Sequence, residues 1–201
     1  MSKILAIFIL ASMAFAGSPA PAAALPVSTF ATVGGETSVP YGWVDFCKRR
    51  PQECSQPPLA ARDIALSASA WKALNRVNRE VNAAIEPISN FDHWGTMLDH
   101  WDYPTDGKGD CKIYALQKRR LLIEAGFPRQ ALLMTIVRDL EGAGHAILTV
   151  KTDRGDFVLD NLTDSIRPWT DTGYRFLKRQ SQEDPNVWLS IQDVAPAVAS
   201  R

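Results

Sequence analysis

The fold is decided by residues 109–128, which read GDCKIYALQKRRLLIEAGFP. Asp110 is a residue type that favours the position just before a helix, and Gly126 is one that favours the position just after a helix. Pro128 then prevents the helix from continuing. The stretch therefore predicts a helix over residues 111–125, and the first residue of that helix is a cysteine.

Apolar, β-rich runs follow this helix. The strong runs are 131–137, 146–151 and 157–159, and the weaker ones are 174–178 and 187–189. Residues 153–156, Asp-Arg-Gly-Asp, predict a turn between the last two strong runs. Upstream, residues 68–85 repeat apolar side chains every three or four positions and predict another helix, which Pro87 ends. Helices followed by antiparallel strands predict one α+β domain.

The composition is that of an ordinary globular domain. The chain has 201 residues, 46% of them hydrophobic, and 22 basic side chains balance 22 acidic ones. A chain of this length can bury a sizeable core. A formal net charge of zero provides no basic surface for neutralising phosphates, so the composition argues against nucleic-acid binding.

The first 24 residues are predicted to be a signal peptide. Lys3 places a positive charge before the apolar run 4–11, and the small residues that end at Ala16 or Ala24 offer cleavage sites. The run is too short to span a bilayer as a mature helix, although an uncleaved membrane anchor is the alternative. We therefore expect a periplasmic or secreted protein with no membrane span in its mature form.

The mature chain is expected to hold one domain between two loose ends. Residues 25–38 are rich in small residues and predict a flexible lead, and residues 192–201 predict a flexible tail. The domain is predicted over residues 39–191.

Three cysteines are present. In an oxidising compartment an odd number implies one pair and one free thiol. Cys47 and Cys54 lie close together in a charged, Pro-containing stretch, so a small disulfide loop is the expected pairing. Cys111 is then the free thiol.

The predicted position of Cys111 favours a reactive thiol. In the first turn of a helix, unpaired backbone N–H groups and the positive end of the dipole favour a thiolate, which is the nucleophilic form. Gly109 permits a tight turn before the helix, and the N–H of Cys111 can point at a developing oxyanion. The alternative is an inert buried thiol.

Two other side chains are expected to lie beside this thiol. His145 opens a predicted strand, and the small residues 142–144 before it leave room around the imidazole. Asp160 ends the next strand. Because two antiparallel strands joined by a tight turn have their open ends side by side, Asp160 should reach His145 and orient the imidazole as a base. The alternatives are a core histidine at a strand edge and a turn-forming aspartate.

Several motifs in this order resemble the bacterial transglutaminase-like cysteine peptidases. They are Gly109-Asp110-Cys111-Lys112-Ile113-Tyr114-Ala115, Gly144-His145-Ala146-Ile147-Leu148, Val158-Leu159-Asp160-Asn161-Leu162 with Pro168-Trp169, Arg179-Gln180-Ser181, Val77-Asn78-Arg79-Glu80-Val81-Asn82, and Trp101 with Pro104. The resemblance covers roughly residues 71–188. It implies a papain-like core in which the helix of the nucleophile packs on an antiparallel sheet. It also implies a periplasmic location and catalytic roles for Cys111, His145 and Asp160.

The resemblance further implies an exported peptidase that cleaves amide bonds of a periplasmic or surface protein through a thioester. The best understood members cleave a surface adhesin. Two alternatives stay open. One is acyl transfer to an amine, as in transglutaminases, because the same three residues serve both reactions. The other is an exported binding module that has the fold but no turnover.

One position departs from the calcium-regulated members of that family, which carry acidic residues just after the cysteine. This chain has Lys112 and Ile113 there, and a lysine cannot ligate a hard cation that needs oxygen donors. Asp110 alone is a poor calcium site, so we expect no metal and no other cofactor. We hypothesise that Lys112 supplies the positive charge near Asp110.

The segment 89–108 is predicted to be a loop, yet it is rich in aromatic rings. Trp101 and Tyr103 are candidates to line a substrate cleft, and the indole N–H is a candidate oxyanion donor. Packing beneath the loop is the alternative for both residues. His93 and His100 are assigned to the surface or to packing, and no ligand pair has the spacing of a structural zinc site.

Overall fold

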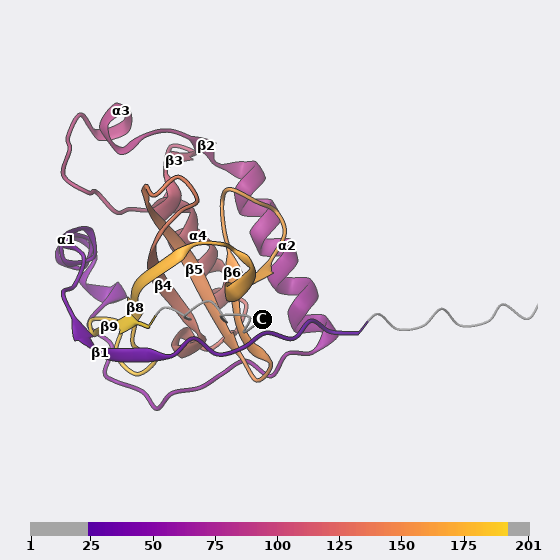
Figure 1. Cartoon of the computed structure of the whole chain (residues 1–201). Coiled ribbons are helices and arrows are strands. Elements are labelled where there is room, and N and C mark those ends of the chain that lie inside the picture. The colour runs from indigo at the N-terminus through magenta and orange to yellow at the C-terminus, as the bar shows by residue number, and fades with distance from the viewer. Residues whose placement is uncertain (1–23, 193–201) are drawn as a thin grey trace, which may run out of the picture.

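A seven-stranded sheet forms the centre of the protein, whose computed structural model describes residues 24–192 (Figure 1). Its strands are β1 (Val33–Thr37), β4 (Leu132–Arg138), β5 (Gly144–Thr152), β6 (Gly155–Leu159), β7 (Arg167–Pro168), β8 (Arg175–Gln180) and β9 (Trp188–Ile191). Their order is β1-β9-β8-β4-β5-β6-β7, and every neighbouring pair is antiparallel. The predicted tail from residue 193 and residues 1–23 of the predicted signal peptide lie outside the described part of the chain.

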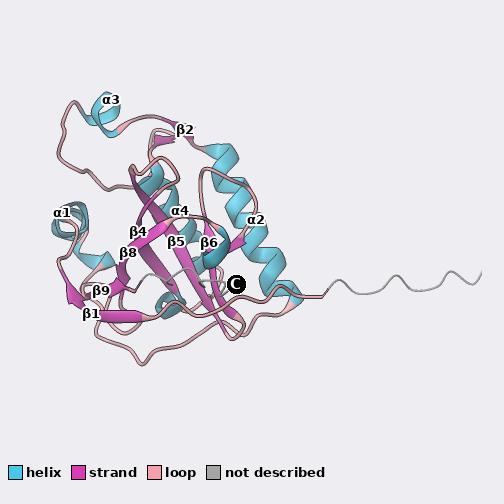
Figure 2. Cartoon of the chain, viewed as in Figure 1, coloured by secondary structure: helices cyan, strands magenta, loops and turns pink. Residues whose placement is uncertain are grey.

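Helices and short strands complete the fold (Figure 2). They are α1 (Tyr41–Arg49), α2 (Ala68–Ala84), α3 (Asn90–Trp94), α4 (Cys111–Glu124), and the single-turn helices η1 (Pro51–Glu53), η2 (Arg129–Ala131) and η3 (Trp169–Asp171). Strands β2 (Glu86–Pro87) and β3 (Lys108–Gly109) pair in parallel as a separate small sheet. Helix α4 packs on β5, and α2 packs on α4. The predicted α+β fold is confirmed, with the helix that begins at Cys111 lying on an antiparallel sheet.

The core follows from the alternation of side chains along β5. Leu148 and Val150 point toward α4 and join the main core, which also contains Leu116 and Trp188. Ile147 points to the other face and joins a smaller cluster. Successive residues of a strand face opposite sides, so both faces of β5 are buried.

Helix α4 begins and ends where its sequence predicts. Asp110 occupies the N-cap position, although its side chain makes no capping hydrogen bond. Gly126 follows the helix with φ of 89°, a left-handed conformation that favours glycine. Most side chains of α4 are buried, which is the pattern of a central helix.

Several elements differ from the expectations, among them α3 (Asn90–Trp94), a short helix inside the segment 89–108 that is predicted to be a loop. The segment 25–38, expected to be a flexible lead, includes β1, an edge strand that pairs with β9. Its sequence, VGGET, has little apolar character, so apolar periodicity does not mark it as a strand. Backbone pairing with β9 holds the strand in place, since it has no buried face. Helix α1 was not predicted either; it buries Trp43 and Phe46.

No helix in the described residues is long and apolar enough to cross a membrane.

Candidate active site

Cys111 is the first residue of α4 and the free thiol, half-buried at the helix start. The other two cysteines, Cys47 and Cys54, form the expected disulfide. Since the first backbone N–H groups of a helix have no partner within the helix, the start of α4 directs them toward the space around the thiol.

His145 and Asp160 meet as the strand geometry predicts. Strands β5 and β6 pair in an antiparallel hairpin, with Leu148 opposite Leu159. His145 lies near the open end of β5, and Asp160 follows the last residue of β6. The imidazole Nε2 is 2.9 Å from Asp160 Oδ1, and both side chains are buried.

A residue that sequence reasoning missed completes this contact. The hydroxyl of Tyr174 donates to Asp160 Oδ2 at 2.6 Å, and the backbone N–H of Leu162 donates to Asp160 Oδ1 at 3.1 Å. The Tyr174 ring also stands edge-on to His145, with centroids 5.7 Å apart. Both carboxylate oxygens are thereby held in place. Tyr174 precedes β8, and nothing in its local sequence marks its hydroxyl as a partner of Asp160.

These contacts shift the pKa of both groups. Burial lowers the pKa of His145, but the hydrogen bonds and charges of Asp160 and Cys111 outweigh burial and raise it to about 10. Burial raises the pKa of Asp160, but the hydrogen bonds of His145 and Tyr174 outweigh burial, so the net shift is downward. The arrangement therefore favours an imidazolium beside an ionised carboxylate.

Cys111 and His145 line one cavity of about 330 Å³. Its other lining residues are Asp99, Trp101, Asp110, Lys112, Ile136, Gly144 and Ala146. A thiol at a helix start can attack the carbonyl carbon of an amide held in such a cavity. An imidazole beside it can protonate the leaving nitrogen.

The two aromatic candidates have different positions. Trp101 lines the cavity, but its indole N–H donates to Asp99 Oδ2 at 2.6 Å and is not free for an oxyanion. Gly42 makes this placement possible, because a Cβ at Gly42 would lie 2.1 Å from the indole. Tyr103 does not line the cavity; it is buried against Phe46, as expected of the packing alternative. The aromatic character of Trp101 and Tyr103 alone could not show which of them lines the cavity and which packs in the core.

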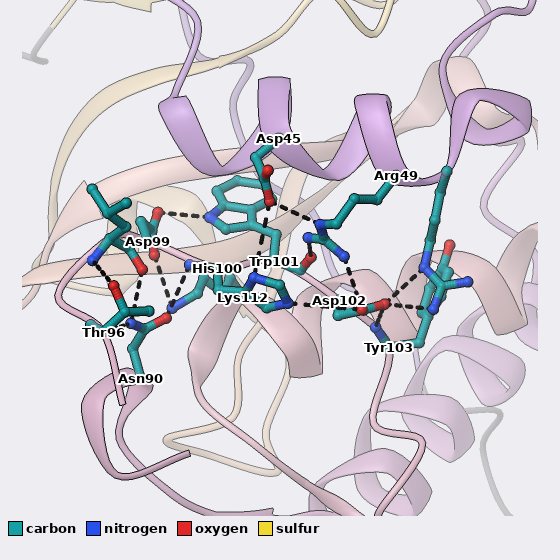
Figure 3. Close-up of polar contacts among 12 residues, drawn as sticks. Asp45, Arg49, Asn90, Thr96, Asp99, His100, Trp101, Asp102, Tyr103 and Lys112 are labelled. Atoms are coloured by element: carbon teal, nitrogen blue, oxygen red, sulfur yellow. Dashed lines mark hydrogen bonds and ion pairs between the residues drawn. The ribbon is translucent and has the colours of Figure 1, made fainter. Parts of the chain in front are cut away.

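Lys112 contacts both acidic residues of the cavity, and Figure 3 shows it beside Asp99. Its ammonium lies 2.8 Å from Asp99 Oδ1 and also contacts Asp110 Oδ2. Burial lowers the pKa of Lys112, but the Asp110 charge and hydrogen bond, with those of Asp99, outweigh burial and raise it. Burial raises the pKa of Asp110, although Lys112 opposes that shift. Sequence reasoning found Lys112 and Asp110 but not Asp99.

The remaining histidines lie outside the cavity. Their imidazoles flank the Trp94 ring, with centroid distances of 4.0 Å for His93 and 4.3 Å for His100. His93 also bonds Asp106 at 2.8 Å. Packing is thus their observed role. Within residues 24–192 there is no group of three or more His, Cys, Asp or Glu side chains arranged to hold a metal ion.

Comparisons with known proteins agree with this architecture. A family model described as "Bacterial transglutaminase-like cysteine proteinase" matches residues 33–195. Legionella pneumophila LapG has a similar fold, with a TM-score of 0.51 and 24% identity over 59% of this chain and 68% of LapG. Its calcium-bound form gives a TM-score of 0.50 and 22% identity, covering 64% of this chain and 75% of the other. No curated protein matches the chain.

Proposed function

The chain belongs to the bacterial transglutaminase-like cysteine proteinases, and on that premise we propose that Cys111, His145 and Asp160 are its catalytic residues. A transglutaminase-like cysteine peptidase acts on a protein substrate. The observation that carries the assignment of residues is the shared cavity of Cys111 and His145, together with the 2.9 Å contact from His145 to Asp160.

The proposed reaction proceeds through a thioester. The Cys111 thiolate attacks the carbonyl carbon of the scissile amide, and the N–H of Cys111 stabilises the oxyanion. As the C–N bond breaks, the His145 imidazolium gives its proton to the leaving amine. The imidazole then takes a proton from water as the water oxygen attacks the thioester; the C–S bond breaks, the carboxylic acid leaves, and the Cys111 thiolate and His145 imidazolium are restored. Asp160 orients the imidazole throughout.

Membership of a proteinase family favours water over an amine as the acceptor. A binding module without turnover would not need a buried imidazole–carboxylate pair beside a free thiol. The Cys47–Cys54 disulfide supports an extracytoplasmic location, because such bonds persist in oxidising compartments. We therefore propose that the substrate is a periplasmic or surface protein.

Comparing peptide termini tests this proposal. In the periplasmic and extracellular proteins of cells that carry the wild type, we expect a set of new termini that is missing from cells carrying Cys111→Ala. Mass spectrometry of labelled N-termini measures this difference. Abundance of the Cys111→Ala protein must match the wild type, which immunoblotting checks. Identical termini in both strains would contradict the peptidase function.

We also propose that the ammonium of Lys112 serves as a tethered cation in place of a metal ion. LapG has been solved with calcium bound. In this chain Lys112 lies between Asp99 and Asp110, so these carboxylates do not fit a calcium ion while Lys112 is present. Asp110 Oδ1 is buried and has no hydrogen-bond partner among the described residues. The Asp110 carboxylate is therefore compensated by the Lys112 ammonium at its other oxygen.

Lys112→Ala should make the protein respond to calcium. Without the ammonium, no cation lies between the Asp99 and Asp110 carboxylates, although Asp99 keeps its hydrogen bond from Trp101, and we expect peptidase activity to fall about tenfold or more. Added Ca²⁺ should restore part of that activity and raise the melting temperature of the variant. Wild type should respond neither to Ca²⁺ nor to a chelator.

Lys108→Ala is the matched control, because Lys108 contacts Glu86 on the surface and lies outside the cavity. This control variant should behave as wild type does. Full activity of Lys112→Ala in a chelator would show that the cavity needs no cation.

A further inference from the structure

The segment 90–99, which contains α3 and the residues that follow it and which we call the rim loop, combines an internal polar network with exposed apolar side chains. Asn90 Nδ2 donates to the carbonyls of Thr96 and Leu98 at 2.7 and 2.9 Å, and Asn90 Oδ1 accepts from His100 N at 2.9 Å. Asp99 is bound to Lys112. Figure 3 shows these contacts converging inside the loop. The polar network therefore fixes the shape of the loop.

Large apolar side chains cover the outside of the same loop. Phe91 is 56% exposed, Met97 is 85% exposed and Leu98 is 60% exposed. Large apolar side chains exposed close together in the sequence are candidates for a binding surface.

Two of these side chains, Phe91 and Met97, line a hollow that shares one lining residue with the active-site cavity. The hollow measures about 280 Å³ and is lined by Ser89, Asn90, Phe91, Thr96, Met97 and Asp99. Asp99 also lines the cavity that contains Cys111 and His145. Both Asp99 oxygens are occupied, one by Trp101 and the other by Lys112. The residue that the two spaces share therefore offers no free charge to a ligand.

We propose that this hollow is a specificity subsite that takes one large apolar side chain of the substrate polypeptide. The proposal rests on the proposed function, because the polypeptide must reach Cys111. An extended chain advances about 3.3 Å per residue and turns alternate side chains to one face. The residue in the hollow consequently lies within a few positions of the scissile bond, and leucine, methionine or phenylalanine fits an apolar wall formed by Phe91 and Met97.

Peptidyl acyloxymethyl ketones test the subsite without requiring turnover, because they alkylate the active-site cysteine. A set of tetrapeptide ketones carries leucine or serine at each position in turn. For one position we expect wild type to react at least about tenfold faster with leucine than with serine, the range in which an apolar pocket discriminates. In the double variant Phe91→Ser with Met97→Ser, that ratio should fall to near one.

Two controls separate this proposal from the peptidase assignment. Iodoacetamide is too small to reach the hollow, so its reaction with Cys111 should be unchanged in the double variant. Leu59→Ser should keep the leucine preference, because Leu59 is 43% exposed and lines neither space.

The outcomes lead to different conclusions. If wild type shows no preference for leucine, or the double variant keeps it, the subsite is wrong and the rim loop is left as a surface for a separate regulatory protein. If iodoacetamide fails to react with Cys111 in wild type, the proposed function itself fails and the subsite falls with it.

Discussion

Replacing Asp160 with asparagine is expected to lower the peptidase rate about 10³- to 10⁴-fold and to move the basic limb of the pH–rate profile to lower pH. Asp160 accepts from His145 Nε2 at 2.9 Å and raises the pKa of the imidazole with its hydrogen bond and charge. An asparagine has no charge, and its amide allows the other tautomer. Both the orientation of the imidazole and its protonated form are then lost.

The direction of the pH effect follows from the pKa of His145. That pKa lies near 10 in the folded protein, above its ordinary value of 6.5. In wild type the His145 imidazolium is present below about pH 10 and is lost as pH rises through 10. Without the Asp160 charge, burial lowers the pKa, so the imidazolium is lost at lower pH. The same raised pKa makes a stabilising contribution that is complete below pH 6.5 and is lost as pH rises through about 10.

The measurement is the rate of peptide hydrolysis, and of iodoacetamide alkylation of Cys111, between pH 5 and pH 11. Tyr174→Phe is the matched control, since it removes only the 2.6 Å hydrogen bond to the other oxygen of Asp160. We expect a loss of about tenfold and a basic limb that stays in place. An Asp160→Asn protein whose basic limb remains near pH 10 would show that Asp160 does not set the pKa of His145.

The parts of this site that sequence reasoning found depend on local signals. Asp110 and Gly126 mark the ends of one helix, so the position of Cys111 could be predicted. A tight turn joins the strands of His145 and Asp160, so their meeting could be predicted as well. In each case the residues involved are near in sequence or joined by a hairpin.

The parts that sequence reasoning missed depend on contacts that no helix boundary or tight turn marks. Asp99 contacts Lys112 only because the segment before β3 folds back over the start of α4. Tyr174 reaches Asp160 from the loop just before β8, and β1 exists through its pairing with β9, at the other end of the domain. Neither residue type nor periodicity encodes these partners. Tyr103 shows the same limit, because an aromatic ring suits a cleft and a core equally well.

The buried cation Lys118 leads to the second prediction, an increase in stability. Lys118 lies on α4 and its side chain is 0% exposed, and its ammonium has no hydrogen-bond partner among the described residues. Burial lowers its pKa to about 7, although the charges of Asp160 and Asp164 partly oppose this shift. An unpaired buried charge is costly. Lys118→Met keeps most of the side-chain volume and removes the charge. The variant should therefore have a larger free energy of unfolding than wild type.

The size of the gain should depend on pH in a defined direction. In the unfolded chain the lysine keeps its ordinary pKa of about 10.5, so between pH 7 and pH 10.5 the unfolded state holds a proton that the folded state has lost. The stability of wild type therefore rises with pH across this window. We expect Lys118→Met to be more stable by roughly 2–5 kcal/mol at pH 6 and to lose this advantage above about pH 10.5.

Urea unfolding at a series of pH values measures this difference, and Lys151→Met provides the contrast. Lys151 is also buried, but it bonds Asp156 at 2.9 Å, and Arg179 bonds the other oxygen of Asp156 at 2.8 Å. Removing a paired cation leaves its partner less compensated, so we expect Lys151→Met to be less stable by about 3 kcal/mol. A Lys118→Met protein that is less stable than wild type at pH 6 would contradict this prediction. It would mean that the Lys118 ammonium has a partner that offsets its burial, as Lys151 has.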